Sequence, residues 1–287
     1  METLSLSLTD NRKAVKNRLP AEDILTFSFE SLDGVECVLV YADGMVNKHL
    51  LGELVARPLQ AVALPDGESR KDVVATTCRF PEIKELTRLD ECEKEVLDGN
   101  ALLLVDGIST AFSFGAKLLP VRSVTEPPTD VAVKGPREGF IEDVKTNMAL
   151  VRKRLKSPDL RLQVSRIGRR SDTAVCLCYL EGIVNEDVKK TVEERLQKVD
   201  VDILPDSSYV AALISERKHS VFRSVGTTER PDVFAAKLAE GRVGVLVDGS
   251  PIALTLPFAQ VEDFQATKIT TFRPLWRRFF VCFACSR

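Results

Sequence analysis

The sequence predicts an α/β protein made of two tandem, internally duplicated subdomains, each a mixed β-sheet packed with helices. Three observations lead to this prediction. The 287 residues exceed a single typical core and suit two domains of about 130 residues each. Segments of the first half recur in the same order in the second half. Within each half, helix-like spacing of apolar residues alternates with strand-like spacing.

The duplication is visible in four pairs of segments. The pairs are residues 11–19 with 147–155, 23–31 with 159–168, 37–47 with 175–185, and 99–107 with 241–249. The first two pairs are separated by 136 residues, the third by 138 and the fourth by 142. A fixed order at nearly constant spacing is typical of an internal repeat. The two halves therefore share one design.

Each half is expected to begin with a basic amphipathic helix that leads into two strands. The second strand ends in an acidic residue and a glycine, at Asp43-Gly44 or Glu181-Gly182. Further helices follow, and the last one in each half meets a glycine near its C-terminus. These helices are expected at residues 46–55, 81–97, 185–199 and 231–239.

A β-hairpin is expected to close each half. Its first strand is apolar, and the dipeptide Asp106-Gly107 or Asp248-Gly249 follows it. Asp-Gly between apolar runs predicts a type I′ turn, because both central positions of that turn need positive φ. The turn accounts for the duplicated aspartates, so we do not interpret them as paired catalytic carboxylates.

The step from helix to strand is clearest in residues 134–170. A Gly-Pro dipeptide predicts a turn that a helix cannot continue through. From Phe140 to Leu155, apolar residues recur mostly at three- and four-residue steps, with acidic residues first and basic residues last, as the helix dipole favours. A Ser-Pro dipeptide ends this helix, and an alternating strand follows. The helix is expected to start directly after the Gly-Pro turn.

The composition is that of an ordinary soluble globular protein, with 44% hydrophobic and 29% charged residues. A net charge of −2 argues against nucleic acid as a partner. No secretory signal and no run of eighteen apolar residues is visible, so a soluble chain is expected. The four expected parts are an N-terminal α/β subdomain (1–126), a Pro-containing linker (127–134), a C-terminal α/β subdomain (135–258) and a divergent basic-aromatic tail (259–287).

The residues give no sign of catalysis. His49 and His219 are the only histidines, and neither lies in a pattern typical of a catalytic triad. Phosphate-loop, dinucleotide and zinc-protease motifs are missing from the sequence. Seven cysteines without a signal peptide favour free thiols, and the CxxC pair Cys282 and Cys285 lacks the further ligands that zinc needs. We therefore expect no enzyme, no cofactor and no metal.

Several long motifs resemble one known family. They are GPREGF with the following basic helix and IGRRS (135–171), YLEGIVN (179–185), VDVDILPDSSY (199–209), TERPDVFAAKLAEGRVGVLVDGSP (228–251) and LLLVDG (102–107). Together they resemble the A subunits of bacterial spore germination receptors, the GerA family, over roughly residues 30 to 258. The length and order of these motifs make chance an unlikely source.

The resemblance implies a spore germination protein: the soluble domain of a nutrient-germinant receptor that acts with B- and C-type subunits, and as a homo-oligomer, at the inner spore membrane. The domain is expected on the cytoplasmic (core) side. The family continues into a membrane-embedded region, whereas this chain ends in a basic-aromatic tail with only a short apolar stretch. The membrane part is therefore expected to be missing or supplied by a partner.

Seven residues are candidates for interaction or interdomain contact: Arg137 and Glu138, Arg169 and Arg170, and Glu229, Arg230 and Asp232. The first pair lies at a predicted helix start. We interpret it either as an anion site or as a helix cap that also packs between the domains. Packing is favoured, because Glu138 repels an anion.

The other two groups also have two readings each. Arg169-Arg170 reads as a phosphate site or as an ordinary surface hairpin tip, and the tip is favoured. If it is functional, a protein contact is expected. The third group lies at a helix start, where Thr228 is a candidate cap and a proline occupies the first turn. Capping and a role in holding the two halves or a partner remain equal readings.

Three functions stay open at this point. The first is germinant sensing, receptor assembly and signalling, in which two lobes joined by a stiff linker move as rigid bodies. The second is a stand-alone module that binds a small molecule between the lobes. The third is an inert, truncated paralogue.

Overall fold

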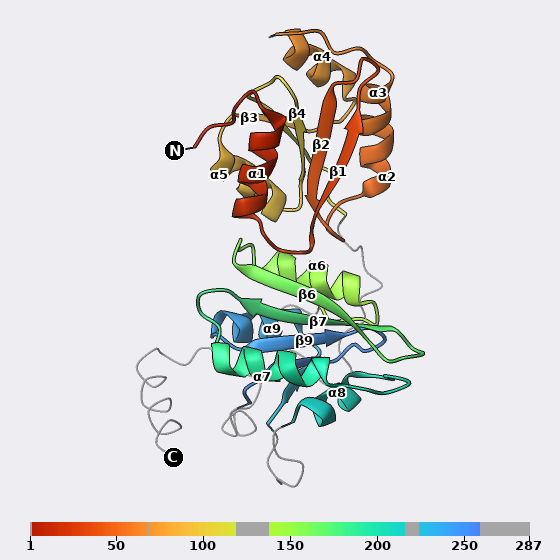
Figure 1. The fold of residues 1–287 in the computed structure, drawn as a ribbon, viewed down its shortest axis with the longest axis vertical. Helices are drawn as coiled ribbons and strands as arrows, with labels where there is room; N and C mark the ends of the chain where they lie inside the picture. The colour runs from red at the N-terminus through yellow and green to blue at the C-terminus, as the bar shows by residue number, and fades with distance from the viewer. Residues whose placement is uncertain (1, 68, 119–137, 216–223, 259–287) are drawn as a thin grey trace.

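The computed structural model describes residues 2–67, 69–118, 138–215 and 224–258. These residues form two lobes, one above the other in Figure 1. We call residues 2–118 lobe 1 and residues 138–258 lobe 2. The expected linker at 127–134 and the expected tail at 259–287 lie outside the described residues, so the proposed domain boundaries stay predictions.

Lobe 1 alternates helices and strands along the chain. Its elements are α1 (Leu8–Arg18), β1 (Ile24–Glu30), β2 (Glu36–Ala42), α2 (Lys48–Leu51), the π-helical turn η1 (Gly52–Ala56), α3 (Arg57–Gln60), α4 (Ser69–Thr77), β3 (Ile83–Leu86), α5 (Leu89–Leu97), β4 (Ala101–Val105) and β5 (Ala111–Phe114).

Lobe 2 repeats this order with longer strands at its start. Its elements are α6 (Val144–Arg154), β6 (Leu160–Ile167), β7 (Thr173–Leu180), α7 (Glu186–Gln197), α8 (Ser207–Ile214), β8 (Gly226–Thr228), α9 (Pro231–Ala239), β9 (Val243–Val247) and β10 (Ala253–Leu256).

The two sheets have the same topology. Strand order is β1-β2-β4-β5-β3 in lobe 1 and β6-β7-β9-β10-β8 in lobe 2. The predicted α/β class with two similar subdomains is confirmed. The prediction of mixed sheets is wrong in one respect, because every strand pairing in the described chain is antiparallel. The chain between the neighbouring strands β2 and β4 includes β3, which pairs at the far edge of the sheet. β2 and β4 are therefore not joined by the single helical crossover that makes neighbouring strands parallel.

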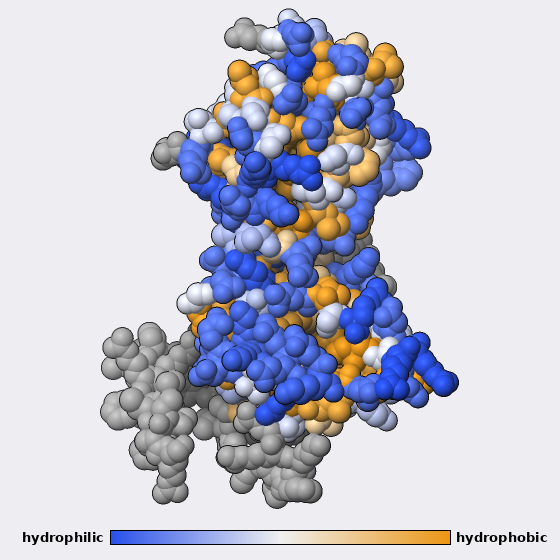
Figure 2. Space-filling view, in the orientation of Figure 1, coloured by the Kyte–Doolittle hydropathy of each residue, from blue (hydrophilic) through white to orange (hydrophobic). Residues whose placement is uncertain are grey.

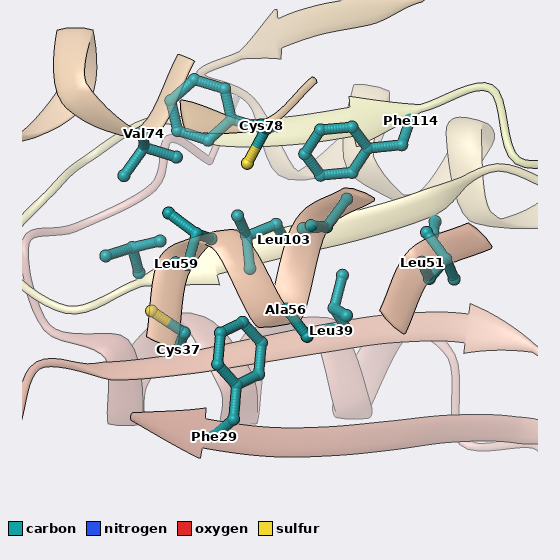
Figure 3. Close-up of a cluster of buried hydrophobic side chains, with 14 of the residues drawn as sticks. Phe29, Cys37, Leu39, Leu51, Ala56, Leu59, Val74, Cys78, Leu103 and Phe114 are labelled. Carbon is teal, nitrogen blue, oxygen red and sulfur yellow. The ribbon is translucent and has the colours of Figure 1, made fainter. Parts of the chain in front are cut away.

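Each sheet lies between two layers of helices, and alternate residues of its strands point into the two layers. In lobe 1, Leu39 and Leu103 pack with the helices from α2 to α4, in the cluster that Figure 3 shows. Val38 and Leu102 point the other way, toward α1 and α5. Lobe 2 repeats the pattern, with α7 and α8 on one face and α6 and α9 on the other. Such two-sided burial explains the near-continuous apolar strands.

Helix α6 begins at Val144, several residues later than predicted. Asp143 is its N-cap and accepts a hydrogen bond from the amide of Thr146. Asn147 then reaches back and bonds both the N–H and the C=O of Ile141. These bonds hold the residues before Asp143 outside the helix, so the apolar spacing from Phe140 onward does not mark helix alone. Lobe 1 has the same device, in which Asn11 bonds Ser5.

Two other helices differ from prediction. Residues 81–97 were expected to be one helix, but β3 occupies their first part and only α5 is helical. The helix expected at 46–55 runs instead from Lys48 to Gln60 as three consecutive helical segments. The helices expected at 185–199 and 231–239 are confirmed as α7 and α9.

The Asp-Gly dipeptides do not form type I′ turns. A five-residue loop joins β4 to β5, and of the dipeptide only Gly107 has positive φ. The carboxylate of Asp106 accepts a hydrogen bond from the amide of Leu8 at the start of α1. Asp248 does the same for Val144 at the start of α6. These aspartates therefore tie the last loop of each lobe to its first helix, a structural role that the sequence pattern did not show.

Candidate functional site at the contact between the lobes

Helix α6 lies between the two lobes (Figure 1), and the molecule is narrower there than through either lobe (Figure 2). One side of α6 packs on the lobe 2 sheet beside α9. Its other side meets the end of lobe 1, where the α1–β1 connection and the end of β2 lie. The lobe contact is therefore built mainly on one helix.

A buried ion pair crosses the contact. Arg152 of α6 is 1% exposed, and Asp23, just before β1, is 5% exposed. The guanidinium donates from Nε to Oδ2 at 2.8 Å and from Nη2 to Oδ1 at 2.6 Å. Two parallel hydrogen bonds between a planar guanidinium and a carboxylate fix both distance and orientation. The pair therefore sets the angle at which the lobes meet.

Lobe 2 holds the arginine in place for this bond. Arg152 Nη1 donates to the carbonyl oxygen of Ser157 at 2.8 Å, and Nη2 donates to that of Leu160 at 3.1 Å. The Ser-Pro turn that ends α6 thus supplies acceptors for the side chain that reaches across to Asp23. Because both Nη atoms also bond carbonyl oxygens of lobe 2, the side chain has little freedom to turn away.

A second polar contact flanks the first. Lys156 Nζ lies 2.7 Å from Oδ1 of Asp98, at the end of α5 in lobe 1. The hydrogen bond from Lys156 holds the pKa of Asp98 below its ordinary value, against the smaller opposing effect of burial. In addition, the amide of Val164 donates to the Glu22 carboxylate at 3.3 Å. These contacts are more exposed and hold the lobes less firmly.

The backbones of the two lobes approach closely at Gly44. Its φ is +73°, and a Cβ added there would lie 3.1 Å from Cβ of Ala149 and 3.3 Å from the carbonyl oxygen of Lys145. Met45 and Ala42 pack with Ala149 in a small apolar cluster. A glycine facing an alanine allows α6 to sit almost directly on the end of β2.

A cavity of about 150 Å³ opens beside this cluster. Its charged lining residues are one acid and three lysines, namely Asp98, Lys117, Lys153 and Lys156. The apolar part of the wall includes Met45, Leu118, Ala149 and Leu150. The cavity lining therefore combines more basic than acidic side chains with apolar ones, and both lobes contribute to it.

Glu138 lies near this cavity but not at a helix start. Its carboxylate accepts hydrogen bonds from Lys153 Nζ at 3.0 Å and from Arg154 Nη2 at 2.7 Å, near the C-terminal end of α6. Burial raises the pKa of Glu138, but the hydrogen bonds from Arg154 and Lys153 together bring it below its ordinary value. The predicted position of Glu138 in the first turn of the helix is wrong, while packing rather than anion binding fits its contacts. Arg137 lies outside the described residues.

Arg169 and Arg170 occupy the tip between β6 and β7, as predicted. Arg169 pairs with Asp200 at 2.5 Å, and its amide bonds the carbonyl of Val201. The amide of Arg170 bonds the carbonyl of Asp202. The tip therefore fastens the loop before α8 and lies at the opposite end of β6 from Leu160 and the lobe contact. An interaction role for these arginines stays a prediction.

Glu229, Arg230 and Asp232 lie at the start of α9. Arg230 Nη2 donates to Asp232 at 2.6 Å, and Pro231 takes the first helical position as expected. Thr228 does not cap the helix; its hydroxyl accepts from the amide of Arg230, which is itself the N-cap residue. The carbonyl of Glu229 accepts from the amide of Phe140 at 2.7 Å. The group thus joins the segment before α6 to α9 within lobe 2.

The residues of the lobe contact were not among the sequence-based candidates. Arg152 and Lys156 were interpreted only as the basic end of a helix, and Asp23 only as the start of a strand. One signal in the repeat alignment could have found them. Arg152 stands where the first half has Lys16, while Asp23 and Asp159 occupy the same place in the two halves. A residue that differs between the two halves at an otherwise repeated position indicates a role that only one half has.

The cysteines of the described residues are buried and free. Burial raises the pKa of the thiols of Cys37, Cys78 and Cys92 to about 12, so they are not thiolate nucleophiles at neutral pH. Within the described ranges, no group of three or more acidic, histidine or cysteine side chains is arranged to hold a metal. Cys282, Cys285 and His219 fall outside them.

No helix in the described ranges combines the length and the apolar character needed to cross a membrane.

Comparison with known proteins relates this architecture to spore germination. The family model described as Bacillus/Clostridium GerA spore germination protein matches residues 12–282. The chain is 36% identical over 261 residues to spore germination protein B1 of Bacillus subtilis, covering 90% of this chain and 53% of that protein. It is 33% identical over 237 residues to spore germination protein KA of the same organism, covering 82% and 44%. The chain thus spans about half the length of these curated relatives.

The fold agrees with a crystal structure of the same kind. The N-terminal domain of the A subunit of the Bacillus megaterium spore germinant receptor GerK3 matches with a TM-score of 0.68 and 29% identity. The match covers 90% of this chain and 98% of that domain. Together with the family match over most of the sequence, these results show that the chain belongs to the GerA family of spore germination proteins and corresponds to the N-terminal domain of a receptor A subunit.

Proposed function

We propose that this domain takes part in sensing nutrient germinants and in assembly and signalling of the receptor, without catalysing a reaction itself. Two lobes with separate cores meet mainly through one helix, and the contact is held by a few specific bonds. Such an arrangement supports a change in lobe orientation as the signal. The partners are B- and C-type receptor subunits at the inner spore membrane, with the domain on the core side. The similarity to receptor A subunits supports this assignment.

The observation that carries the proposal is the Arg152–Asp23 pair. Each lobe has its own cores on both faces of its sheet, so neither lobe depends on the other for its packing. The buried pair is therefore free to serve orientation rather than lobe folding. A receptor that signals by lobe movement needs a contact of this kind, which is specific in geometry and limited in extent.

The test is germination of spores in which Arg152→Met replaces the native residue in the corresponding receptor gene. The proposal expects an altered response to nutrient, at unchanged receptor level on immunoblots. Lys16→Met is the matched control, because Lys16 occupies the same repeat position but is exposed. A covalent crosslink between the lobes that left germination unaffected would contradict the signalling proposal.

A second candidate function is binding of a small molecule between the lobes, which the cavity of about 150 Å³ favours. This volume lies below the range of about 300–1,000 Å³ typical of drug-sized ligands, so it suits a molecule of a few heavy atoms. Two of its three lysines already pair with acids, Lys156 with Asp98 and Lys153 with Glu138, so Lys117 is the lining cation that favours a carboxylate group on that molecule. Thermal unfolding of the purified protein with amino acids and other small carboxylates tests this, since a ligand of the folded state raises the melting temperature.

An inert paralogue is the alternative to both. It predicts that deleting the gene, or substituting Arg152, leaves nutrient-induced germination unchanged. A germination defect in either strain, with the other receptors intact, contradicts it.

A further inference from the structure

The outer face of α8 carries apolar side chains that no segment of the described ranges covers. Tyr209 is 57% exposed and Leu213 is 39% exposed, and the two lie about one helical turn apart. Ile203, in the loop that leads into α8, is 60% exposed. We call these three residues the α8 face. Val210 and Ile214 already anchor the helix in the core beneath, so the α8 face is not needed to hold α8 in place.

Lobe 1 shows that this fold does not require an apolar outer face here. Its corresponding helix is α4, which also precedes the edge strand of its sheet. The exposed positions of α4 include Asp72 and Thr76, and its apolar residues are buried or half-buried. Large apolar side chains grouped on an exposed face are typical of a surface that contacts another segment or molecule. The α8 face is therefore a candidate contact surface.

The chain leaves lobe 2 beside this surface. Ser215, the C-cap of α8, and Ser224 share a hydrogen bond of 2.8 Å between their hydroxyls. The amide of Phe258, the last described residue, donates to the carbonyl oxygen of Ser224 at 3.2 Å. Residues 259–287, which we call the tail, therefore begin two hydrogen bonds away from the end of α8. Figure 1 shows α8 at the end of lobe 2 that points away from lobe 1.

Charge also matches the tail to this surface. Residues 199–215 contain three aspartates and no lysine or arginine. One of them, Asp202, directly precedes Ile203, is exposed and takes part in no ion pair within the described part of the chain. Residues 264–287 contain five basic residues and no acidic one, and aromatic residues alternate with them around Trp276. The tail thus combines basic and aromatic residues, where the α8 face combines acidic and apolar ones.

We propose that the tail docks on the α8 face of its own chain, with Trp276 and the aromatic residues beside it covering Tyr209 and Leu213. Burial of these side chains from water drives the contact. The arginines next to Trp276 are attracted to Asp202 and the neighbouring aspartates, which orients the tail on the surface. Docking fixes the direction in which the chain leaves lobe 2.

The length of the tail permits this contact. Trp276 is eighteen residues beyond Phe258, and a chain of that length extends up to about 60 Å. The whole of α8 is only about 12 Å long, so reach does not limit docking. Covalent attachment raises the effective concentration of the tail to about millimolar. A contact too weak to hold two separate molecules together is therefore populated within one chain.

The experiment uses the fluorescence of the full chain, because Trp276 is its only tryptophan and reports on the tail alone. We expect emission at a shorter wavelength than that of tryptophan in water, and protection from quenching by acrylamide. Leu213→Asp and Tyr209→Ser should each lower the equilibrium constant for docking by about tenfold or more, since each removes a large apolar contact. Emission then shifts to longer wavelength and quenching rises. High salt should weaken docking only in part, because it screens the charges and not the apolar contact.

Leu32→Asp is the matched control, because Leu32 is 68% exposed between β1 and β2 of lobe 1. It should leave the emission of Trp276 unchanged, and circular dichroism checks that every variant is folded. Water-like emission from the native chain overturns the proposal, as does emission that ignores both α8 substitutions. Emission that changes on dilution shows a contact between chains. A shift that appears only with vesicles of anionic lipid shows that the tail binds a lipid surface; either result also overturns the proposal.

Discussion

Arg152 shows how a single side chain can connect two folded units. Two of its hydrogen bonds stay within lobe 2 and two cross to Asp23 in lobe 1. A buried arginine is costly unless its charge is paired and its donors are bonded, and here the carboxylate of the other lobe supplies the counter-charge and accepts two of the four hydrogen bonds. The charge pair therefore gives the contact a defined orientation that apolar packing alone would not specify.

Replacing Arg152 with methionine should destabilise the chain strongly. The substitution leaves Asp23 buried without a partner, and breaking a buried pair in this way costs about 3–5 kcal/mol. Lys16→Met, at the equivalent exposed position of α1, should cost less than about 0.5 kcal/mol. Urea unfolding followed by circular dichroism measures both. Equal effects of the two substitutions would show that the pair does not hold the lobes.

The Asp98–Lys156 pair should make stability depend on pH. The pKa of Asp98 in the folded chain lies below its ordinary value of 3.8, mainly through the hydrogen bond from Lys156. A lowered pKa contributes stability above the unfolded-state value, and this contribution is lost as the pH falls through the folded-state value. The difference in unfolding free energy between the native chain and Lys156→Met should therefore be largest near neutral pH. It should vanish in strong acid; a difference that persists there contradicts the assignment.

At the scale of elements, α1 and α6 share a design but differ in their outer faces. Both begin next to an aspartate of the last loop, and both carry an asparagine that bonds back to the preceding segment. Only α6 is covered on both sides, since its Ala149 faces Gly44 of lobe 1. The exposed lysines of α1 are typical of a solvent face, whereas the small residue of α6 permits close helix packing.

Gly44→Ala and Gly182→Ala form a matched pair that isolates this packing. Both glycines have positive φ, so an alanine costs about 1–2 kcal/mol at either site. At Gly44 the new Cβ would also lie 3.1 Å from Cβ of Ala149, so the α6 side of the contact would have to move by a few tenths of an ångström. Gly44→Ala should therefore cost about 1 kcal/mol more than Gly182→Ala. Thermal unfolding of the two variants measures this difference, and equal losses of stability would show that α6 does not press on Gly44.

At the scale of the whole molecule, the chain consists of two three-layer lobes joined by a narrow contact (Figure 1). Each sheet has helices on both faces and its own pair of cores. No strand of one lobe pairs with a strand of the other among the described elements. Each lobe therefore has what an independent domain needs.

A fragment of residues 138–258 should fold on its own and unfold cooperatively. In this fragment Arg152→Met should cost less than about 1 kcal/mol, because Asp23 is missing and water replaces it around the guanidinium. The same substitution costs several times more in the whole chain if the pair acts between the lobes. Calorimetry of the fragment with and without the substitution measures this. An unfolded fragment, or an undiminished cost, would show that the lobes are not separate units.

Much of this architecture could be predicted from the sequence. The repeat offsets gave two equal lobes, and apolar runs gave the buried strands β4 and β9. The start of α6 was missed for a local reason. Side-chain bonds such as that from Asn147 to Ile141 compete with helix formation, and the apolar spacing does not reveal them.

The sequence by itself determined the fold class, the duplication and the family. The fold class follows from the periodic spacing of apolar residues, and the duplication and the family follow from long motifs in a fixed order. Only the tertiary structure decided that the strands are all antiparallel, that Asp106 and Asp248 anchor helices, and that Arg152 meets Asp23. These facts join residues as far as 129 positions apart. Such contacts depend on how two packed lobes come together, which no local pattern encodes. The site therefore became visible only when both repeats were folded and in contact.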